Sequence, residues 1–168
     1  MKKIIFFSLI LFFTLDTYSQ ALKVGDLAPD LAYENPREKI MKLSSLRGKY
    51  VIVDFWASWC GPCRRENPNL VSTYKQFKNA KFKNGKGLEV YSVSLDKKLS
   101  SWLKAMTVDK LFWEYHVSDL KGWQSDAASL YGVRSIPQTF ILDGEGEIIA
   151  KDLKGDALNN FLKSQKIN

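Results

Sequence analysis

The stretch that decides the fold is residues 51–71, which read VIVDFWASWCGPCRRENPNLV. Together with the residue before it, this stretch opens with the apolar, β-branched run Tyr50–Phe55, which is typical of a strand buried on both faces. From Cys60 onward the pattern favours a helix, so the motif Cys-Gly-Pro-Cys falls at a strand-to-helix junction. We expect the rest of the chain to pack around this strand and this helix.

The position of Cys60 favours a reactive sulfur. A helix N-terminus carries unpaired N–H groups and the positive end of the helix dipole, and both stabilise a thiolate over a thiol. We therefore expect the pKa of Cys60 to lie below that of an ordinary thiol. Cys63 follows one helical turn later, where its sulfur can attack a mixed disulfide that Cys60 has formed. This is the arrangement that thiol–disulfide exchange needs, with Cys60 as nucleophile and Cys63 as resolving thiol.

Residues 53–68 (VDFWASWCGPCRRENP) resemble the active site of the thioredoxin superfamily and, more narrowly, of the extracytoplasmic TlpA/ResA-like thiol–disulfide oxidoreductases. Residues 25–30 (GDLAPD) are similar to the opening of TlpA-like proteins and also of peroxiredoxins, and residues 43–49 (LSSLRGK) resemble a further family motif. The resemblance covers nearly all of the chain beyond the leader. It implies a thioredoxin-like α/β fold, in which helices flank a central mixed β-sheet, with an N-terminal β-hairpin and an extra α/β insertion.

Release of a reduced substrate needs a group that takes the proton of Cys63, and two acids are candidates. Asp54 matches the buried aspartate of thioredoxin, and burial in an apolar strand would raise its pKa toward neutrality. Glu66 follows Cys63 by one helical turn and matches the acid in the family pattern C-x-x-C-x-x-E-x-P. The alternatives are a solvent-facing Asp54 and a Glu66 paired with Arg or Lys on the helix surface. The division of labour between the two acids stays open at this point.

The resemblance also implies a set of substrate contacts. Pro137 follows Ile136 at the entrance of an expected strand, where an ordinary edge proline is one interpretation. The family instead has a cis proline there, packed against the cysteine motif, and offers the Ile136 backbone to an extended substrate segment. Trp59, Gly61 and Pro62 are expected to complete this contact surface.

Hydrophobic periodicity and turn residues divide the rest of the chain into short elements. A hairpin is expected at the sheet edge, followed by strands that alternate with helices. The expected hairpin strands are Leu31–Tyr33 and Ile40–Leu43, and the later strands are Leu88–Leu95, Phe112–Val117, Thr139–Leu142 and Glu147–Ala150. The expected helices are Cys60–Phe77, a helix capped by Ser100 or Ser101 that ends near Val108, Trp123–Tyr131 and Asp156–Ser164.

Composition argues against several classes of function. The chain has 168 residues, of which 45% are hydrophobic, enough for one domain with a sizeable core. Its net charge of +7 comes from lysines that are not interleaved with aromatic residues, which argues against nucleic-acid binding. The two cysteines share one motif, and with the single histidine, His116, they leave a tetrahedral zinc site a ligand short. We expect no metal, no soluble cofactor and a structural role for His116.

Residues 1–19 match a secretory signal peptide, which leaves residues 20–168 as the thioredoxin-like domain. Lysines at the start precede the apolar run Ile4–Leu15, and small residues precede a cleavage site between Ser19 and Gln20. The apolar run is shorter than the roughly 20 residues that span a bilayer, and an uncleaved anchor is the alternative. The leader predicts a periplasmic protein, whose catalytic dithiol needs a dedicated supply of electrons.

Together these observations predict an exported thiol–disulfide oxidoreductase that reduces disulfides in other exported proteins, an apocytochrome being one example. The Gly-Pro pair between the cysteines is of the thioredoxin type, which by resemblance implies that the protein acts as a reductant. Its electrons are expected to come from a membrane thiol reductant. A monomer is expected. A peroxiredoxin would carry the pattern T-x-x-C, but Ala57 stands in place of that threonine. The other rivals are a copper metallochaperone of the Sco type, which would carry C-x-x-x-C and a distal histidine, and a non-catalytic holdase.

Overall fold

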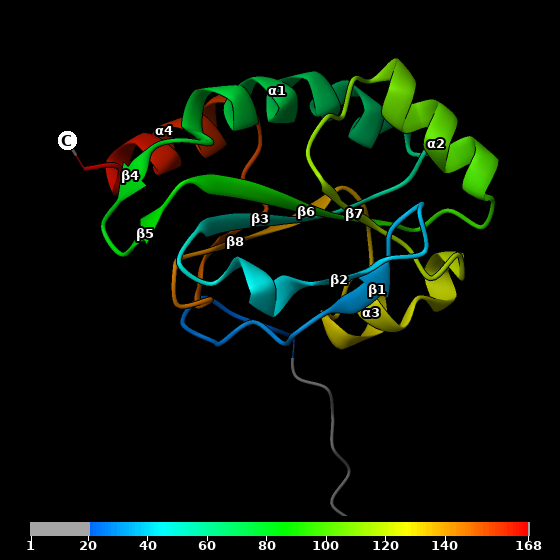
Figure 1. The fold of residues 1–168 in the computed structure, drawn as a ribbon, viewed down its shortest axis with the longest axis horizontal. Helices are drawn as coiled ribbons and strands as arrows, with labels where there is room; N and C mark the ends of the chain where they lie inside the picture. The colour runs from blue at the N-terminus through cyan, green and yellow to red at the C-terminus, as the bar shows by residue number, and fades with distance from the viewer. Residues whose placement is uncertain (1–20, 168) are drawn as a thin grey trace, which may run out of the picture.

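The structure is a computed structural model that describes residues 21–167. Its centre is a five-stranded mixed sheet (Figure 1). The strand order across the sheet is β7 (Tyr115–Val117), β6 (Leu88–Ser94), β3 (Tyr50–Trp56), β8 (Gln138–Leu142) and β9 (Ile148–Lys151). The expected signal peptide and its cleavage site lie outside the described residues. No helix within residues 21–167 is long and apolar enough to cross a membrane.

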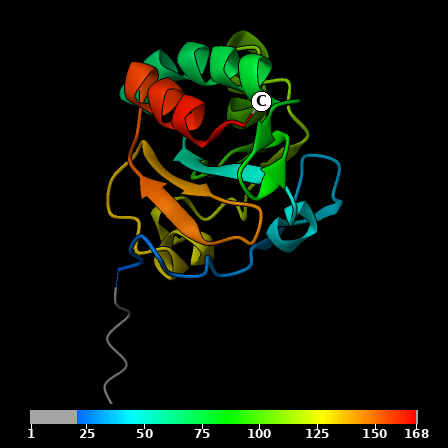
Figure 2. The same ribbon diagram turned by 90° about the vertical axis from the view of Figure 1, so that its left-hand side faces the viewer.

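Further elements cover both faces of the sheet. One face carries the helices α1 (Gly61–Phe77), α2 (Leu99–Val108) and α4 (Gly155–Gln165). The opposite face carries the strands β1 (Ala32–Glu34) and β2 (Ile40–Lys42), the 3-10 helix η1 (Leu43–Leu46) and the helix α3 (Asp126–Leu130). The view turned by 90° shows the same division into layers (Figure 2). The thioredoxin-like α/β architecture expected from the sequence is confirmed.

Strand β3 lies in the middle of the sheet and leads into the cysteine motif. It pairs in parallel with β6 and antiparallel with β8, which makes the sheet mixed. All seven of its residues are buried, because the layers on both faces cover it. The apolar run Tyr50–Phe55 is thus the buried strand that its composition indicates, extended by Trp56.

Helix α1 follows β3 and packs its apolar side on the sheet. Leu70 and Phe77 are buried, whereas Tyr74 is half-buried and lies against the rings of Phe112 and Trp113. Strand β6 then runs parallel to β3, which completes the predicted strand–helix–strand unit. This connection places the end of β3 and the start of α1 at the carboxyl edge of the parallel strands, where open α/β sheets bind their ligands.

The N-terminal hairpin forms as predicted. Its strands β1 and β2 pair antiparallel. The Tyr91 hydroxyl, on β6, donates to the carbonyl oxygen of Met41 at 2.8 Å, and the Ser118 N–H, just after β7, donates to that of Glu34 at 3.3 Å. These bonds hold the hairpin beside β7, the edge strand of the sheet.

Three expected boundaries are wrong. Helix α2 begins at Leu99 after Lys98, which makes no side-chain cap bond, so neither Ser100 nor Ser101 caps it. The expected helix Trp123–Tyr131 is divided into the 3-10 helix η2 (Gly122–Gln124) and α3. The division falls at Ser125, because its side chain accepts the N–H of Ala128 and starts a new helix there. The strand expected over Phe112–Val117 is limited to β7.

A short ribbon of β4 (Lys81–Phe82) and β5 (Gly85–Lys86) was not expected from the sequence. It turns the chain between α1 and β6. Phe82 is buried there and stacks on Tyr50, with the ring centroids 4.2 Å apart. The ribbon therefore closes the end of the sheet that lies away from the cysteine motif.

Candidate active site

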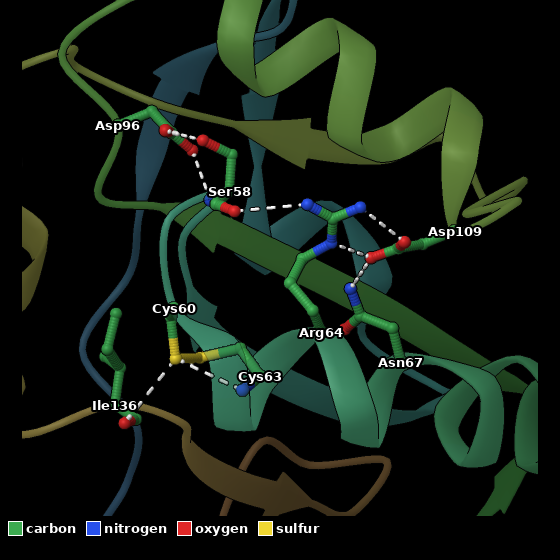
Figure 3. Close-up of a disulfide and its surroundings, with 8 residues drawn as sticks. All are labelled: Ser58, Cys60, Cys63, Arg64, Asn67, Asp96, Asp109 and Ile136. Atoms are coloured by element: carbon green, nitrogen blue, oxygen red, sulfur yellow. Dashed lines mark hydrogen bonds and ion pairs between the residues drawn. A yellow bond between two sulfur atoms is a disulfide. The ribbon is translucent and has the colours of Figure 1, made fainter.

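The cysteine motif lies at the junction between β3 and α1, as the sequence predicts. Cys60 is the N-cap of α1, and the N–H of Cys63 donates to its sulfur at 3.1 Å (Figure 3). The two cysteines form a disulfide, with their Cα atoms 5.2 Å apart. Pro62 occupies the first turn of α1, where its missing N–H removes no helical hydrogen bond. The sulfur of Cys60 is thus held at the positive end of the helix.

The two sulfurs differ in access to solvent. Cys60 is 5% exposed and Cys63 only 1%, whereas Gly61 and Pro62 between them are exposed. A group that approaches from outside therefore meets Cys60 first. This difference fits the expected roles of an attacking Cys60 and an internal, resolving Cys63.

The Ile136–Pro137 segment packs against the motif. Its peptide bond is cis, as the resemblance implies, and the carbonyl oxygen of Ile136 lies 3.7 Å from the sulfur of Cys60. Strand β8 begins directly after it, at Gln138, which pairs with Phe55 on β3. The antiparallel pairing of β8 with β3 thus brings Pro137 to the cysteines although the two lie far apart in the sequence.

Asp54 is buried in β3, with 5% of its surface exposed, so the alternative of a solvent-facing Asp54 is wrong. Its carboxylate accepts a hydrogen bond from Ser92 Oγ at 3.4 Å, and Ser92 Oγ in turn accepts one from the indole N–H of Trp113 at 3.1 Å. The pKa of Asp54 is raised to about 7, mainly through desolvation by burial. The charge of Glu66 contributes to this rise, whereas the Ser92 hydrogen bond and Lys154 oppose it.

Glu66 is half-buried on α1 and is held by hydrogen bonds rather than by a basic side chain. Its Oε1 accepts the N–H of Gly155 at 2.7 Å, at the start of α4, and its Oε2 accepts Asn69 Nδ2 at 3.1 Å. No ion pair of Glu66 with a lysine or arginine is found among residues 21–167, so the alternative of a surface ion pair is wrong. Asp54, Cys63 and Glu66 line one narrow pocket together with Pro137.

Arg64 fixes the loop that leads into the motif, a role that the sequence did not predict. Its guanidinium makes a bidentate ion pair with Asp109 at the end of α2, and its Nη1 donates to the carbonyl oxygen of Ser58 at 3.1 Å (Figure 3). Asn67 Nδ2 donates to the same Asp109 carboxylate at 2.6 Å. These charge-assisted hydrogen bonds join the loop before Cys60, helix α1 and the end of α2.

Comparison with known proteins assigns the chain to a family. Residues 24–151 match the model of the AhpC/TSA family. The chain belongs to this family. Within it, the chain is 33% identical over 135 residues to the thiol–disulfide oxidoreductase ResA of Oceanobacillus iheyensis, covering 75% of this chain and 62% of that protein. It therefore spans less than two thirds of that relative. The ResA of Geobacillus kaustophilus is 31% identical over 134 residues, which cover 79% of this chain and 70% of that protein.

A solved structure gives the same assignment. The thioredoxin domain of a thiol–disulfide oxidoreductase from Bacteroides vulgatus superposes with a TM-score of 0.76 at 35% identity, covering 86% of this chain and 98% of that domain. The chain thus has the thioredoxin-like fold and belongs to the AhpC/TSA family, and the proteins that it is similar to are thiol–disulfide oxidoreductases, as the resemblance in residues 53–68 implies.

His116 of this AhpC/TSA-family protein lies in the core, away from the cysteines. It is buried, its ring stacks on Trp113 with centroids 5.1 Å apart, and desolvation by burial lowers its pKa to about 4. It does not line the narrow pocket beside Cys63. Within residues 21–167, no group of three His, Cys, Asp or Glu side chains is placed to hold a metal ion.

Proposed function

We propose that this chain reduces disulfide bonds in exported proteins through a dithiol–disulfide cycle of Cys60 and Cys63. The observation that carries the proposal is the Cys60–Cys63 disulfide at the N-terminus of α1, where the N–H of Cys63 points at the Cys60 sulfur. In the reduced protein the same N–H and the helix dipole stabilise a Cys60 thiolate. The more accessible sulfur is thus also the better nucleophile.

The cycle has two displacement steps. The Cys60 thiolate attacks one sulfur of the substrate disulfide, forms a mixed disulfide and releases the other sulfur as a thiolate. The Cys63 thiolate then attacks Cys60, forms the Cys60–Cys63 bond and releases the second substrate sulfur. The substrate gains two electrons and the protein loses two, so an external dithiol must reduce the protein again before the next cycle.

Asp54 is the group that takes the proton of Cys63 before the second step. The two residues line the same pocket, whose volume of about 10 Å³ is close to the minimum for one water, so the pocket has room for one water that carries the proton. A pKa of about 7 lets the Asp54 carboxylate accept a proton near neutrality and return it later. Glu66, held by the N–H of Gly155, acts as a positioning residue that raises the pKa of Asp54 through its charge.

The substrate segment binds across the exposed surface around Cys60. Trp59, Gly61 and Pro62 are exposed on one side of the sulfur, and Ile136 and Pro137 are half-exposed on the other. An extended segment can pair its backbone with that of Ile136, next to the carbonyl oxygen that faces Cys60. This mode accepts many sequences, because backbone groups supply the recognition.

The setting of the cycle follows from the leader. Residues 1–19 act as a signal peptide that is cut before Gln20, and residues 20–168 work in the periplasm as a monomer. A membrane thiol reductant supplies the electrons, and disulfide-containing exported proteins, apocytochromes among them, receive them. The redox-active disulfide carries the electrons of this proposed cycle, which calls for neither a metal nor a soluble cofactor. The ResA relatives, which are named thiol–disulfide oxidoreductases, support the disulfide chemistry of the cycle.

The test is a single-turnover comparison of two oxidants with the reduced protein. A protein disulfide is expected to oxidise the Cys60–Cys63 pair much faster than hydrogen peroxide does, and Cys60→Ser is expected to abolish the reaction. Cys63→Ser should accumulate the mixed disulfide, because the second step is missing. A faster reaction with peroxide would assign the chain to the peroxidases, and a fully active Cys60→Ser variant would assign it to the holdases.

A further inference from the structure

Beside the cysteine motif lies a groove of which the cycle above uses only Trp59. Its volume of about 510 Å³ is in the range of a specific ligand site. Three segments form it: the loop before Cys60, the loop between β6 and α2, and the 3-10 helix η2. The groove is lined by Ser58 and Trp59, the two residues that directly precede the reactive Cys60 in the chain.

One wall of the groove consists of two exposed indoles. Trp59 is 54% exposed and Trp123 is 50% exposed, and their ring centroids lie 6.1 Å apart at an interplanar angle of 54°. The rings therefore contact each other and present one continuous apolar surface. Exposed aromatic pairs of this kind are typical of interaction sites, because burying them on binding gains much apolar contact at little cost in side-chain entropy.

The floor of the groove is held by hydrogen bonds to the carboxylate of Asp96. The Asp96 carboxylate is buried and accepts the backbone N–H of Ser58 at 2.9 Å and its hydroxyl at 2.5 Å (Figure 3). The hydroxyl of Ser94 donates to it as well, at 2.7 Å. These bonds join the β6–α2 loop to the loop before Cys60, so the groove is formed before any ligand arrives.

The rim of the groove is positively charged. Lys97 and Lys98 are exposed, and neither makes an ion pair within residues 21–167. The stem of Lys97 passes over Gly122, where an added Cβ would come within 2.7 Å of Lys97 Cε. The missing side chain of Gly122 thus leaves the space that the Lys97 stem occupies beside Trp123. Two unpaired ammonium groups next to an apolar wall match a ligand that carries an apolar side chain and a carboxylate.

We propose that this groove binds the polypeptide that flanks the disulfide under attack, with an apolar side chain on the Trp59–Trp123 wall and an acidic side chain against Lys97 and Lys98. The inference rests on the proposed function and adds a substrate preference to it: among disulfide-bearing segments, those with aromatic and acidic residues beside the cysteine react fastest. Backbone pairing at Ile136 accepts any sequence, whereas this groove selects among sequences.

The test uses four peptides, each joined through its cysteine to thionitrobenzoate as a coloured leaving group. The cysteine is flanked by Phe and Asp, by Phe and Lys, by Gly and Asp, or by glycines alone. The reduced protein attacks, releases the coloured thiolate and then releases the peptide as it closes the Cys60–Cys63 disulfide. The wild-type protein is expected to react about 10-fold faster with the Phe–Asp than with the Phe–Lys peptide at low salt, and less selectively at high salt.

Charge reversal gives the decisive variant. Lys97→Glu combined with Lys98→Glu is expected to invert the preference, so that the Phe–Lys peptide becomes the faster one. Trp123→Ala is expected to slow both Phe peptides by about 5- to 10-fold and the glycine peptides much less. Lys104→Gln is the matched control, because Lys104 is an exposed lysine of α2 that does not line the groove. This variant should keep the wild-type ratio of the Phe–Asp and Phe–Lys rates.

The possible outcomes separate this inference from the function on which it rests. An unchanged Phe–Asp to Phe–Lys ratio in the charge-reversed protein would overturn the groove proposal while leaving disulfide reduction intact. A dimer in solution that Trp123→Ala dissociates would assign the groove to a second copy of the chain and would also overturn it. Failure of the wild-type protein to react with any of the four peptides would instead contradict the proposed function.

Discussion

Asp54 and Cys63 line the same narrow pocket, one delivered by the last part of β3 and the other by the first turn of α1. Desolvation raises the pKa of Asp54 to about 7, so its protonation state changes near neutrality. The structure thus places an acid that titrates near neutrality in the same pocket as Cys63, whose sulfur must lose its proton in the proposed cycle.

Replacing Asp54 with Asn should slow the second displacement step. In the wild-type protein the rate of substrate release from the Cys60 mixed disulfide should rise with pH through about 7, as the carboxylate becomes able to accept a proton. The Asp54→Asn protein should be about 100-fold slower at neutral pH and should respond only to the titration of Cys63 itself. Stopped-flow release from a preformed mixed disulfide measures this. An unchanged rate would remove Asp54 from the proton path.

The same substitution should stabilise the oxidised protein at alkaline pH. The folded pKa of Asp54, about 7, lies above its ordinary value of 3.8, so the folded state binds the proton more tightly and loses stability as the pH rises between these values. Asp54→Asn removes that loss, and it should raise the Tm by about 5 °C at pH values above 7 and by little near pH 4. Thermal unfolding at several pH values measures this. Glu145→Gln, which changes an exposed carboxylate, should show no such trend.

Replacing Glu66 with Gln separates the charge of this residue from its hydrogen bonds. The amide oxygen of Gln can still accept the N–H of Gly155. The negative charge of the Glu66 carboxylate, which raises the pKa of Asp54, is lost in this variant. The pH profile of substrate release should therefore move to lower pH with little loss of stability. Glu66→Ala, which loses both, should in addition destabilise the start of α4 by about 1 kcal/mol. A profile that stays in place in Glu66→Gln would make Glu66 a purely structural residue.

Replacing Arg64 with Met should destabilise the protein, because among residues 21–167 it leaves the Asp109 carboxylate with the Asn67 amide as its one side-chain partner. Asp109 is nearly buried, with 10% of its side chain exposed, whereas Arg64 is 29% exposed, so solvent screens part of the loss. The expected cost is about 1–2 kcal/mol in the free energy of unfolding. Arg65→Met is the matched control, since Arg65 is exposed and makes no ion pair within residues 21–167. Equal stability of the two variants would contradict the role given to Arg64.

The sequence predicts the centre of the molecule well, because the signals there are local. The β-branched run before Asp54 is typical of a covered strand, and the cysteine motif after it favours the start of a helix. The order of the remaining elements follows from periodicity and from turn residues. The burial of Asp54 agrees with the resemblance to thioredoxin, whereas the sequence alone leaves a solvent-facing Asp54 open as an alternative.

The features that the sequence does not predict depend on contacts between residues far apart in the chain, or on which of several residues caps a helix. Arg64 and Asp109 are 45 residues apart, and no local pattern links them. Trp59 and Trp123 meet only because η2 folds back beside the cysteine loop. Ser125 divides an apparently continuous helical segment because its hydroxyl caps α3, and periodicity does not report such a choice.

The measurement that tests the central claim most directly is the reduction potential of the Cys60–Cys63 pair, obtained by equilibrating the protein with thiol buffers of defined composition. A reductant of the thioredoxin type should have a value near about −270 mV. A value near about −120 mV would make the protein an oxidant that introduces disulfides, and would contradict the proposed direction of the cycle. If the pair formed no disulfide at any buffer composition, the cycle itself would be contradicted.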